Sequence, residues 1–336
     1  MKMSVVINVV KEELEYLPTA LKSVKGWADE IVVIDMECEE EVKQMAKRFG
    51  ARVVSRKREP CVEIARNFGI AQAKGEWVLI LDPDEEVGEA LKDKLKNIAL
   101  GDPSTSSAKK DNETPPNLPF SKGEESPLFD KEGVRGSSTI TFVRIPRKNI
   151  IFGKWMQHSR WWPDYNIRFF KRGYVEWDEK IHSIPLTKGR GIDLPAEENL
   201  ALIHHHYQTI SQFIQRLDRY TYQQLHILQN HKYQFQWSDL ITKPANEFLS
   251  RYFSGEGYQD GIHGLALALL QSTSELILYL KAWEADKFSQ QQIKPVQLET
   301  VFRKSFKDSA WWIADLFQRQ ANYQKYLFWK IKQKLL

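Results

Sequence analysis

The chain has 336 residues, a length that suits one large domain with additions or two domains. Lysine and arginine total 48 against 44 aspartate and glutamate, which leaves a formal net charge of only +4. This balance argues against a general nucleic-acid-binding protein and against a disordered acidic chain. The hydrophobic content of 42% supplies enough material for a core.

Cysteine usage and hydropathy indicate the compartment. Cys38 and Cys61 lie in neither a CxxC nor a Cys/His spacing, so neither a disulfide framework nor a zinc site is expected. The first ten residues lack the small-residue cleavage site of a signal peptide. The most apolar stretch, 264–280, is interrupted by polar residues at 271–275, which favours a buried or interfacial helix over a membrane span. We therefore expect a cytoplasmic protein.

Strand and helix patterns alternate over the first 90 residues. Continuous apolar runs predict strands at 4–10, 31–34, 52–54 and 77–81, and helical spacing predicts helices at 12–24, 39–49 and 62–73. This alternation predicts an α/β fold with a mainly parallel sheet. In such sheets ligands bind at the carboxyl ends of the strands, where Asp35 and Asp82 fall.

The remaining chain divides into three parts. Residues 101–138 are rich in Pro, Ser, Lys and Glu without periodicity, and we interpret them as a surface insertion, with an acceptor-site lid as the alternative. Strand patterns follow at 139–145 and 166–170. Helices are predicted at 211–229, 238–253, 264–283 and from 298 onward. The expected organisation is a catalytic domain at 1–210, interrupted by the insertion, and a helical, aromatic-rich region at 211–336.

The strongest site signal is the sequence Asp82-Pro83-Asp84 directly after a predicted strand. Two carboxylates at this spacing suit Mg²⁺ or Mn²⁺, with the phosphates of a substrate as further ligands. Such a metal ion would neutralise a departing diphosphate. The alternative is an acidic turn in which Asp84 or Glu85 caps a helix.

Many ordered pieces of the chain resemble a family 2 glycosyltransferase of the GT-A fold. They are Ser4-Val5-Val6-Ile7, Glu12-Glu13, Asp29 through Asp35, Ala65-Arg66-Asn67, and Gly75 through Glu85. Later pieces resemble the branch that contains lipopolysaccharide-core β-glucosyltransferases, namely Phe152 to Trp155, Trp161 to Asp164, Arg168 to Phe170, and Gly257 to Gly261. Lys11, Met36 and Pro83 depart from the residues common in the family at their positions.

The resemblance implies a role for each site residue. Glu12 and Asp35 would contact the nucleoside, and Arg66 would meet a phosphate or fix an aspartate. Asp82 would face the ribose or the sugar and share in binding the metal, for which Asp84 would be the principal ligand.

An inverting transfer also needs a general base near the acceptor hydroxyl. Asp164 resembles the acidic acceptor-site residue of the family, with Glu176 and Asp178 as competitors. His182 resembles a further metal ligand, although a lone histidine is commonly structural. For the triplet at 204–206 we expect no metal binding, because adjacent residues on a strand point to opposite faces.

The resemblance implies a metal-dependent inverting glycosyltransferase with a nucleotide-sugar donor, UDP-hexose above others. The implied acceptor is a glycan or a lipid-linked molecule in envelope polysaccharide or lipopolysaccharide synthesis. A nucleotide pyrophosphorylase is disfavoured, because the glycine-rich loop after its first strand is missing and the first glycine here is Gly26. A non-catalytic carbohydrate- or protein-binding module remains as the alternative.

The segment from 316 to 336 has no acidic residue and interleaves lysines with aromatic side chains. Such a segment suits the surface of an anionic membrane. The alternative is a helix docked on the catalytic domain. The first interpretation places the protein peripherally at the inner face of the plasma membrane.

Overall fold

The computed structural model describes residues 2–38, 40–59, 62–102, 139–177 and 185–336. Almost all of the segment 101–138, which we interpret as a surface insertion, lies outside these residues. Asp178 and His182 also lie outside them. The chain forms two compact units. The sheet unit contains Met1–Ile150 and Pro163–His206, and the helical unit contains Ile151–Trp162 and Tyr207–Leu336.

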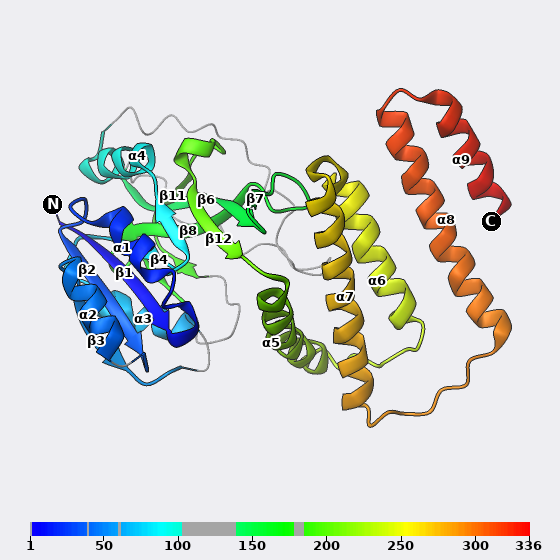
Figure 1. Cartoon of the computed structure of the whole chain (residues 1–336), viewed down its shortest axis with the longest axis horizontal. Helices are drawn as coiled ribbons and strands as arrows, with labels where there is room; N and C mark the ends of the chain where they lie inside the picture. The colour runs from blue at the N-terminus through cyan, green and yellow to red at the C-terminus, as the bar shows by residue number, and fades with distance from the viewer. Residues whose placement is uncertain (1, 39, 60–61, 103–138, 178–184) are drawn as a thin grey trace. The chain divides into compact units, whose positions relative to one another are not determined.

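A mixed sheet organises the sheet unit, in the order β3-β2-β1-β4-β8-β6-β12-β5 (Figure 1). Its parallel half contains β3 (Arg52–Arg56), β2 (Glu30–Met36), β1 (Met3–Val10) and β4 (Trp77–Leu81). Its other half contains β8 (Asp164–Lys171), antiparallel to β4, then β6 (Ile140–Ile151), β12 (Leu202–Tyr207) and β5 (Glu85–Val87). Strand β11 (Arg190–Asp193) adds to β6 in parallel. This arrangement confirms the predicted α/β fold class.

Helices cover both faces of the parallel half, because its strands are apolar on both sides. Val5, Ile7 and Val9 of β1 belong to the core under α1 (Leu17–Val24), α2 (Glu40–Arg48) and α4 (Glu89–Leu100). Val6 points to the other face, against α3 (Val62–Gln72). Helix α3 lies close to the sheet, since a Cβ at Gly69 would come within 2.6 Å of Val6 Cγ1.

The first predicted helix is shorter in the structure than in the sequence pattern. The predicted range 12–24 splits into a 3-10 turn at Lys11–Glu13 and helix α1, which begins at Leu17 with a proline in its first turn. Proline suits this position because it has no N–H to donate. The sequences of β5 and β12 show no clear alternation of apolar and polar residues. Strand β5 has only three residues, and β12 contains the histidine triplet.

The helical unit contains α5 (Ile210–Asn230), α6 (Asp239–Leu249), α7 (Ile262–Ala285), α8 (Pro295–Arg319) and α9 (Tyr323–Leu335). Helix α7 packs against α5 and α6, and α8 packs against α6 and α9. Within the described residues only α7 is long and apolar enough, by length and composition, to cross a membrane. The predicted last helix divides at residues 320–322, where the Asn322 side chain accepts a hydrogen bond from Lys325 N and caps α9.

A half-buried carboxyl group lies within this helical unit. Burial, aided by the negative charge of Glu247, raises the pKa of Glu275 to about 7 against the opposing charges of Lys243 and Arg251. The folded state therefore binds more protons than the unfolded chain between about pH 4 and pH 7, where a free glutamate has already ionised. Stability consequently falls as the pH rises through this window.

We expect Glu275→Gln to remove this pH dependence. Its free energy of unfolding should exceed that of the parent chain by about 1 to 3 kcal/mol near pH 8 and differ little near pH 5. Urea unfolding at both values measures the difference. Glu284→Gln, at an exposed position of the same helix, is the control and should change neither value. An equal change in the free energy of unfolding of Glu275→Gln at both pH values would contradict the raised pKa of Glu275.

Candidate functional site

The predicted site residues gather at one edge of the sheet, which we call the carboxyl edge. Strands β1 to β4 run parallel, so the segments that follow them all emerge there. Strand β8 runs against β4 and therefore begins at this edge, and β6 runs against β8 and therefore ends there. The antiparallel pairing of β12 with β5 places His204 opposite Glu85.

Asp82 lies between two guanidinium groups. Arg66 Nη2, from α3, is 3.1 Å from Asp82 Oδ1 and 3.2 Å from Oδ2. Arg168, from β8, pairs with Asp82 Oδ2 and also donates to Glu85 Oε1 at 2.7 Å. Glu85 is fully buried, and its other oxygen accepts from the backbone N–H of Asp82 at 3.0 Å. Arg66 was predicted to meet a phosphate or to fix an aspartate, and in the structure its guanidinium group contacts Asp82.

The side chains of Asp82 and Arg168 stabilise each other in their charged forms. Burial by itself raises the pKa of Asp82, but the charges of Arg168 and Arg66 outweigh it and keep that pKa well below its usual range. The pKa of Arg168 rises, because the attraction of Asp82 and Glu85 outweighs the effect of burial. Both carboxylate oxygens of Asp82 are already occupied by guanidinium groups. The cluster therefore fixes the turn that carries Asp84.

Hydrogen bonds join Asp164 to His204 through Asn149, and His204 in turn lies beside Asp84. Asn149 Nδ2 donates to Asp164 Oδ2 at 3.2 Å, so the amide oxygen of Asn149 faces His204 Nδ1, which is 2.6 Å away. With this orientation of the amide, His204 carries its proton on Nδ1 and keeps a lone pair on Nε2. That Nε2 lies 3.6 Å from Asp84 Oδ2. Asn149, His204 and Asp84 are all buried.

Asp164 begins β8 and is surrounded by donors. Arg147 Nε lies 2.9 Å and Nη2 2.6 Å from Asp164 Oδ2, and Asn166 Nδ2 lies 3.2 Å from Oδ1. Burial raises the pKa of Asp164, but the charge of Arg147 and the hydrogen bond from Asn149 outweigh it and lower that pKa. The carboxylate is thus ionised at neutral pH, and both of its oxygens accept hydrogen bonds. Glu176, its competitor, is exposed in the short strand β9 (Val175–Glu176).

The two predicted nucleoside contacts also lie at the carboxyl edge. Asp35, in β2, is buried and accepts hydrogen bonds from Cys38 N at 2.8 Å and from Ser55 Oγ at 3.2 Å. Glu12 follows β1, is largely exposed, and pairs with Arg58 Nη1 at 2.8 Å. Asp35 is therefore held by the loop that follows β2 and by β3, whereas the carboxylate of Glu12 is open to solvent.

The histidine triplet follows the expected alternation and still reaches the acidic turn. His204 Nε2 and His206 Nδ1 lie 3.2 Å apart on one face of β12, whereas His205 Nε2 pairs with Glu86. The alternation leaves one histidine, His204, directly beside Asp84. Within the described ranges, no group of three or more His, Cys, Asp or Glu side chains could hold a metal ion without other ligands.

The sequence analysis assigned no role in this network to Glu85, Asn149, Arg168 or His204. Arg168 stands between the apolar residues Ile167 and Phe169 of β8, and a charged residue in such a place indicates a buried polar network. That pattern could have identified Arg168. The partners of all four residues depend on strand pairing, which the local sequence does not encode.

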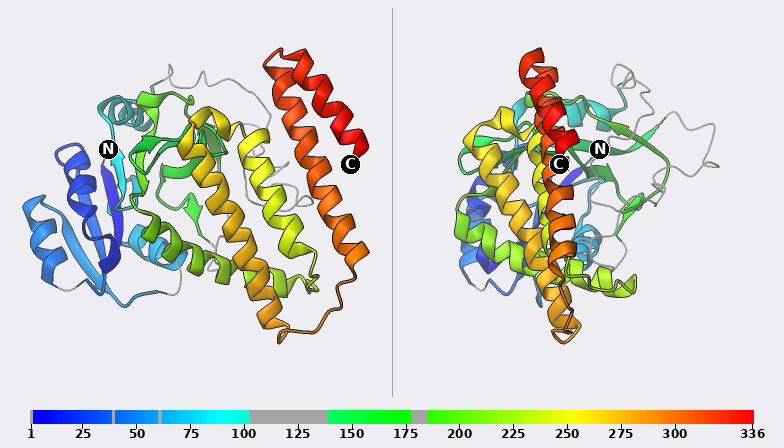
Figure 2. Two further views of the ribbon diagram at one scale, coloured as in Figure 1. Left: turned by 45° about the vertical axis from the view of Figure 1, so that its right-hand side comes forward. Right: turned by 90° about the vertical axis from the view of Figure 1, so that its right-hand side faces the viewer.

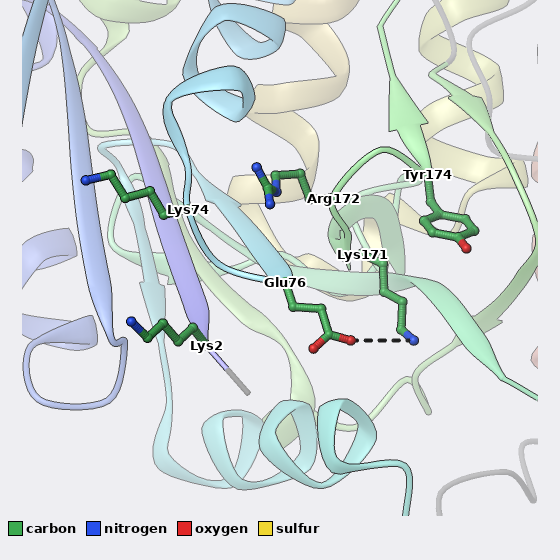
Figure 3. A pocket seen from close by; sticks show the side chains of 6 residues that line it. All are labelled: Lys2, Lys74, Glu76, Lys171, Arg172 and Tyr174. Atoms are coloured by element: carbon green, nitrogen blue, oxygen red, sulfur yellow. Dashed lines mark ion pairs between the residues drawn. The ribbon is translucent and has the colours of Figure 1, made fainter.

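A separate hollow lies at the opposite edge of the sheet and contains none of the predicted site residues (Figure 3). Its cavity volume is about 490 Å³. Its lining side chains are mostly basic: Lys2, Lys74, Glu76, Lys171, Arg172 and Tyr174. Lys171 Nζ lies 3.8 Å from Glu76 Oε1. The side chains named above for the carboxyl edge take no part in it.

Comparison with known proteins gives partial matches. A TPR repeat-containing protein of Synechococcus elongatus is 38% identical over 79 residues, which are 24% of this chain and 20% of that protein. An uncharacterized glycosyltransferase of Rickettsia bellii is 33% identical over 92 residues, which are 27% of this chain and 30% of that protein. The chain thus spans less than a third of the length of these relatives.

Solved structures give similarly partial alignments. Residues 1–349 of TarS from S. aureus, in complex with UDP, align at 26% identity and a TM-score of 0.27, over 30% of this chain and 32% of that one. Glucosyl-3-phosphoglycerate synthase of Mycobacterium tuberculosis aligns at 27% identity and a TM-score of 0.22, over 25% and 34%. The family described as Glycosyl transferase family 2 matches residues 4–104, which include β1 to β4 and the Asp82-Pro83-Asp84 turn. Residues 4–104 of this chain are therefore similar to the family described as Glycosyl transferase family 2.

Proposed function

We propose that the protein is a metal-dependent, inverting glycosyltransferase that uses a nucleotide-sugar donor, UDP-hexose above others. The observation that carries this proposal is the buried pair of Asp84 and His204, at the carboxyl edge of a glycosyl transferase family 2 domain. A carboxylate and an imidazole lone pair at this distance fit a divalent metal ion bound by donor phosphates.

The donor set fits Mg²⁺ or Mn²⁺. Ligand atoms about 2.1 Å from such an ion lie roughly 3 to 4 Å from one another, and Asp84 Oδ2 and His204 Nε2 are 3.6 Å apart. Mg²⁺ is commonly held by one or two carboxylates together with substrate phosphates and water, so the protein need not supply a complete cage. The bound ion would stabilise the charge that develops on the departing diphosphate.

The other residues bind and orient the substrates. Glu12 and Asp35 would hold the nucleoside, and the cluster of Asp82, Arg66 and Arg168 would fix the turn beside the diphosphate. The Nε–H of Arg66 is buried and has no hydrogen-bond partner among the described residues, so it remains available to an anionic oxygen. His182 stays a proposed further metal ligand.

Asp164 is the proposed general base. It would accept the proton of the acceptor hydroxyl as that oxygen attacks the anomeric carbon, while the bond from carbon to the diphosphate oxygen breaks with inversion. Its low pKa makes it a weak base, so the transfer relies on the diphosphate as a good leaving group. The proposed acceptor is a glycan or lipid-linked molecule in envelope polysaccharide or lipopolysaccharide synthesis.

The test is a nucleotide-release assay over UDP-, GDP-, CMP- and ADP-sugars with Mg²⁺, Mn²⁺ or a chelator. We expect release from a UDP-hexose that requires a divalent ion. Metal-dependent binding of UDP without turnover of any donor, with glycan acceptors supplied, would instead identify a non-catalytic binding module. Absence of both would refute the proposal.

We expect Asn149→Ala to weaken metal binding, because Asn149 orients the imidazole of His204. Loss of such a partner commonly weakens metal affinity about 10- to 100-fold. The concentration of Mn²⁺ that half-activates nucleotide release should rise by that factor, and saturating Mn²⁺ should restore most of the rate.

Asn166→Ala is the matched control, since Asn166 also donates to Asp164, whereas the side chain that contacts His204 Nδ1 is that of Asn149. It should leave the Mn²⁺ requirement unchanged. Equal Mn²⁺ requirements in the two variants would show that Asn149 does not act through His204.

A further inference from the structure

Helix α9 packs against α8 through one side only (Figures 1 and 2). Tyr326, Trp329, Lys330 and Gln333, at spacings of three and four residues, are the half-buried side chains on that side. Lys330 Nζ lies 5.7 Å from the ring centre of Trp311, a residue of α8, which places Lys330 on the packed side. The opposite side of α9 faces away from its helical partner.

That opposite side carries an apolar stripe. Leu327, Ile331 and Leu335 follow one another at four-residue spacing, and Phe328 lies beside them. Their exposed fractions are 60%, 52%, 77% and 52% respectively. Four large apolar side chains in one exposed row would be costly to leave in water, and such rows mark surfaces that bind something.

Lysines border this stripe on both sides. Lys334 lies along one border, and Lys325 and Lys332 lie seven residues apart along the other. Helix α9 contains no acidic residue. Lys332 Nζ lies 5.0 Å from the Phe328 ring, so its aliphatic stem covers apolar surface while its charge stays at the border.

We propose that this face of α9 docks on an anionic lipid bilayer. The stripe would enter the boundary between headgroups and acyl chains, and Lys325, Lys332 and Lys334 would reach the anionic headgroups on either side. Charge complementarity favours a lipid surface over a second copy of this face, because two copies would bring six lysines together. A peripheral position at the inner face of the plasma membrane follows from this proposal and requires no transmembrane helix.

The test is co-sedimentation of the full chain with vesicles of phosphatidylcholine alone or mixed with phosphatidylglycerol. We expect binding to the mixed vesicles that decreases with salt. Leu327→Asn/Ile331→Asn should reduce it more than tenfold, and Lys332→Gln/Lys334→Gln should reduce it about fivefold for each lysine removed. Leu100→Asn, at an equally exposed leucine of α4, is the matched control and should bind normally.

Three results would overturn the proposal. They are binding to neither kind of vesicle, equal binding by all variants, and self-association of the parent chain that the leucine–isoleucine variant abolishes without any binding to lipid. Binding that persists in both α9 variants and resists salt would instead implicate the apolar helix α7. Nucleotide release in the absence of vesicles is measured in parallel, so failure of docking is distinguishable from failure of the proposed transfer reaction.

Discussion

Asp84→Asn is expected to abolish metal-dependent transfer while preserving the fold. The amide keeps the shape of the carboxylate but loses its charge, and with it the principal metal ligand. Loss of several kcal/mol of transition-state stabilisation, at about 1.4 kcal/mol per tenfold change in rate, corresponds to a fall in kcat/KM of roughly a thousandfold. Nucleotide release with the best donor of the panel measures this fall.

The matched control for this variant is Asp93→Asn, at an exposed aspartate of α4. It should retain full activity. Circular dichroism and thermal unfolding establish that both variants are folded. A folded Asp84→Asn protein with turnover close to that of the parent chain would rule out the metal assignment.

Arg168→Met is expected to destabilise the protein strongly. It removes the cation that pairs with both Asp82 and Glu85 and leaves a fully buried carboxylate with less compensation. Breaking a buried ion pair from one side typically costs about 3 to 5 kcal/mol. Urea unfolding at neutral pH measures the loss, and Arg168→Lys, which keeps the charge, should lose less.

The pH dependence of this loss gives a second test. The folded-state pKa of Asp82 is depressed, so its stabilising contribution is present above its unfolded pKa of about 4 and is lost as the pH falls toward the folded value. The difference in stability between Arg168→Met and the parent chain should therefore shrink below about pH 4. Arg172→Met, at an exposed arginine just past the same strand, should be close to neutral throughout.

The parallel half of the sheet and its acidic edge could be predicted from the sequence alone. Strands buried on both faces read as continuous apolar runs, and the helices between them show a clear period. Parallel strands share a carboxyl edge, so the order of elements was enough to place Asp35 and Asp82 there. The sequence alone also determined that alternate residues of the triplet at 204–206 face opposite ways, since that follows from strand geometry.

The partners across the site were decided only by the tertiary structure. Asp84 and His204 are 120 residues apart, and they meet because β12 pairs antiparallel with β5 in one particular register. Arg168 reaches Asp82 because β8 runs against β4, a pairing between strands separated by the insertion. In α9, composition revealed the lysines and aromatics, but which of them face away from α8 depends on packing between the two helices. Local sequence specifies the periodicity of apolar residues and the preferences of the backbone. Strand register and helix packing depend instead on the free energy of the whole chain. The ion pairs across this site form through those long-range strand pairings.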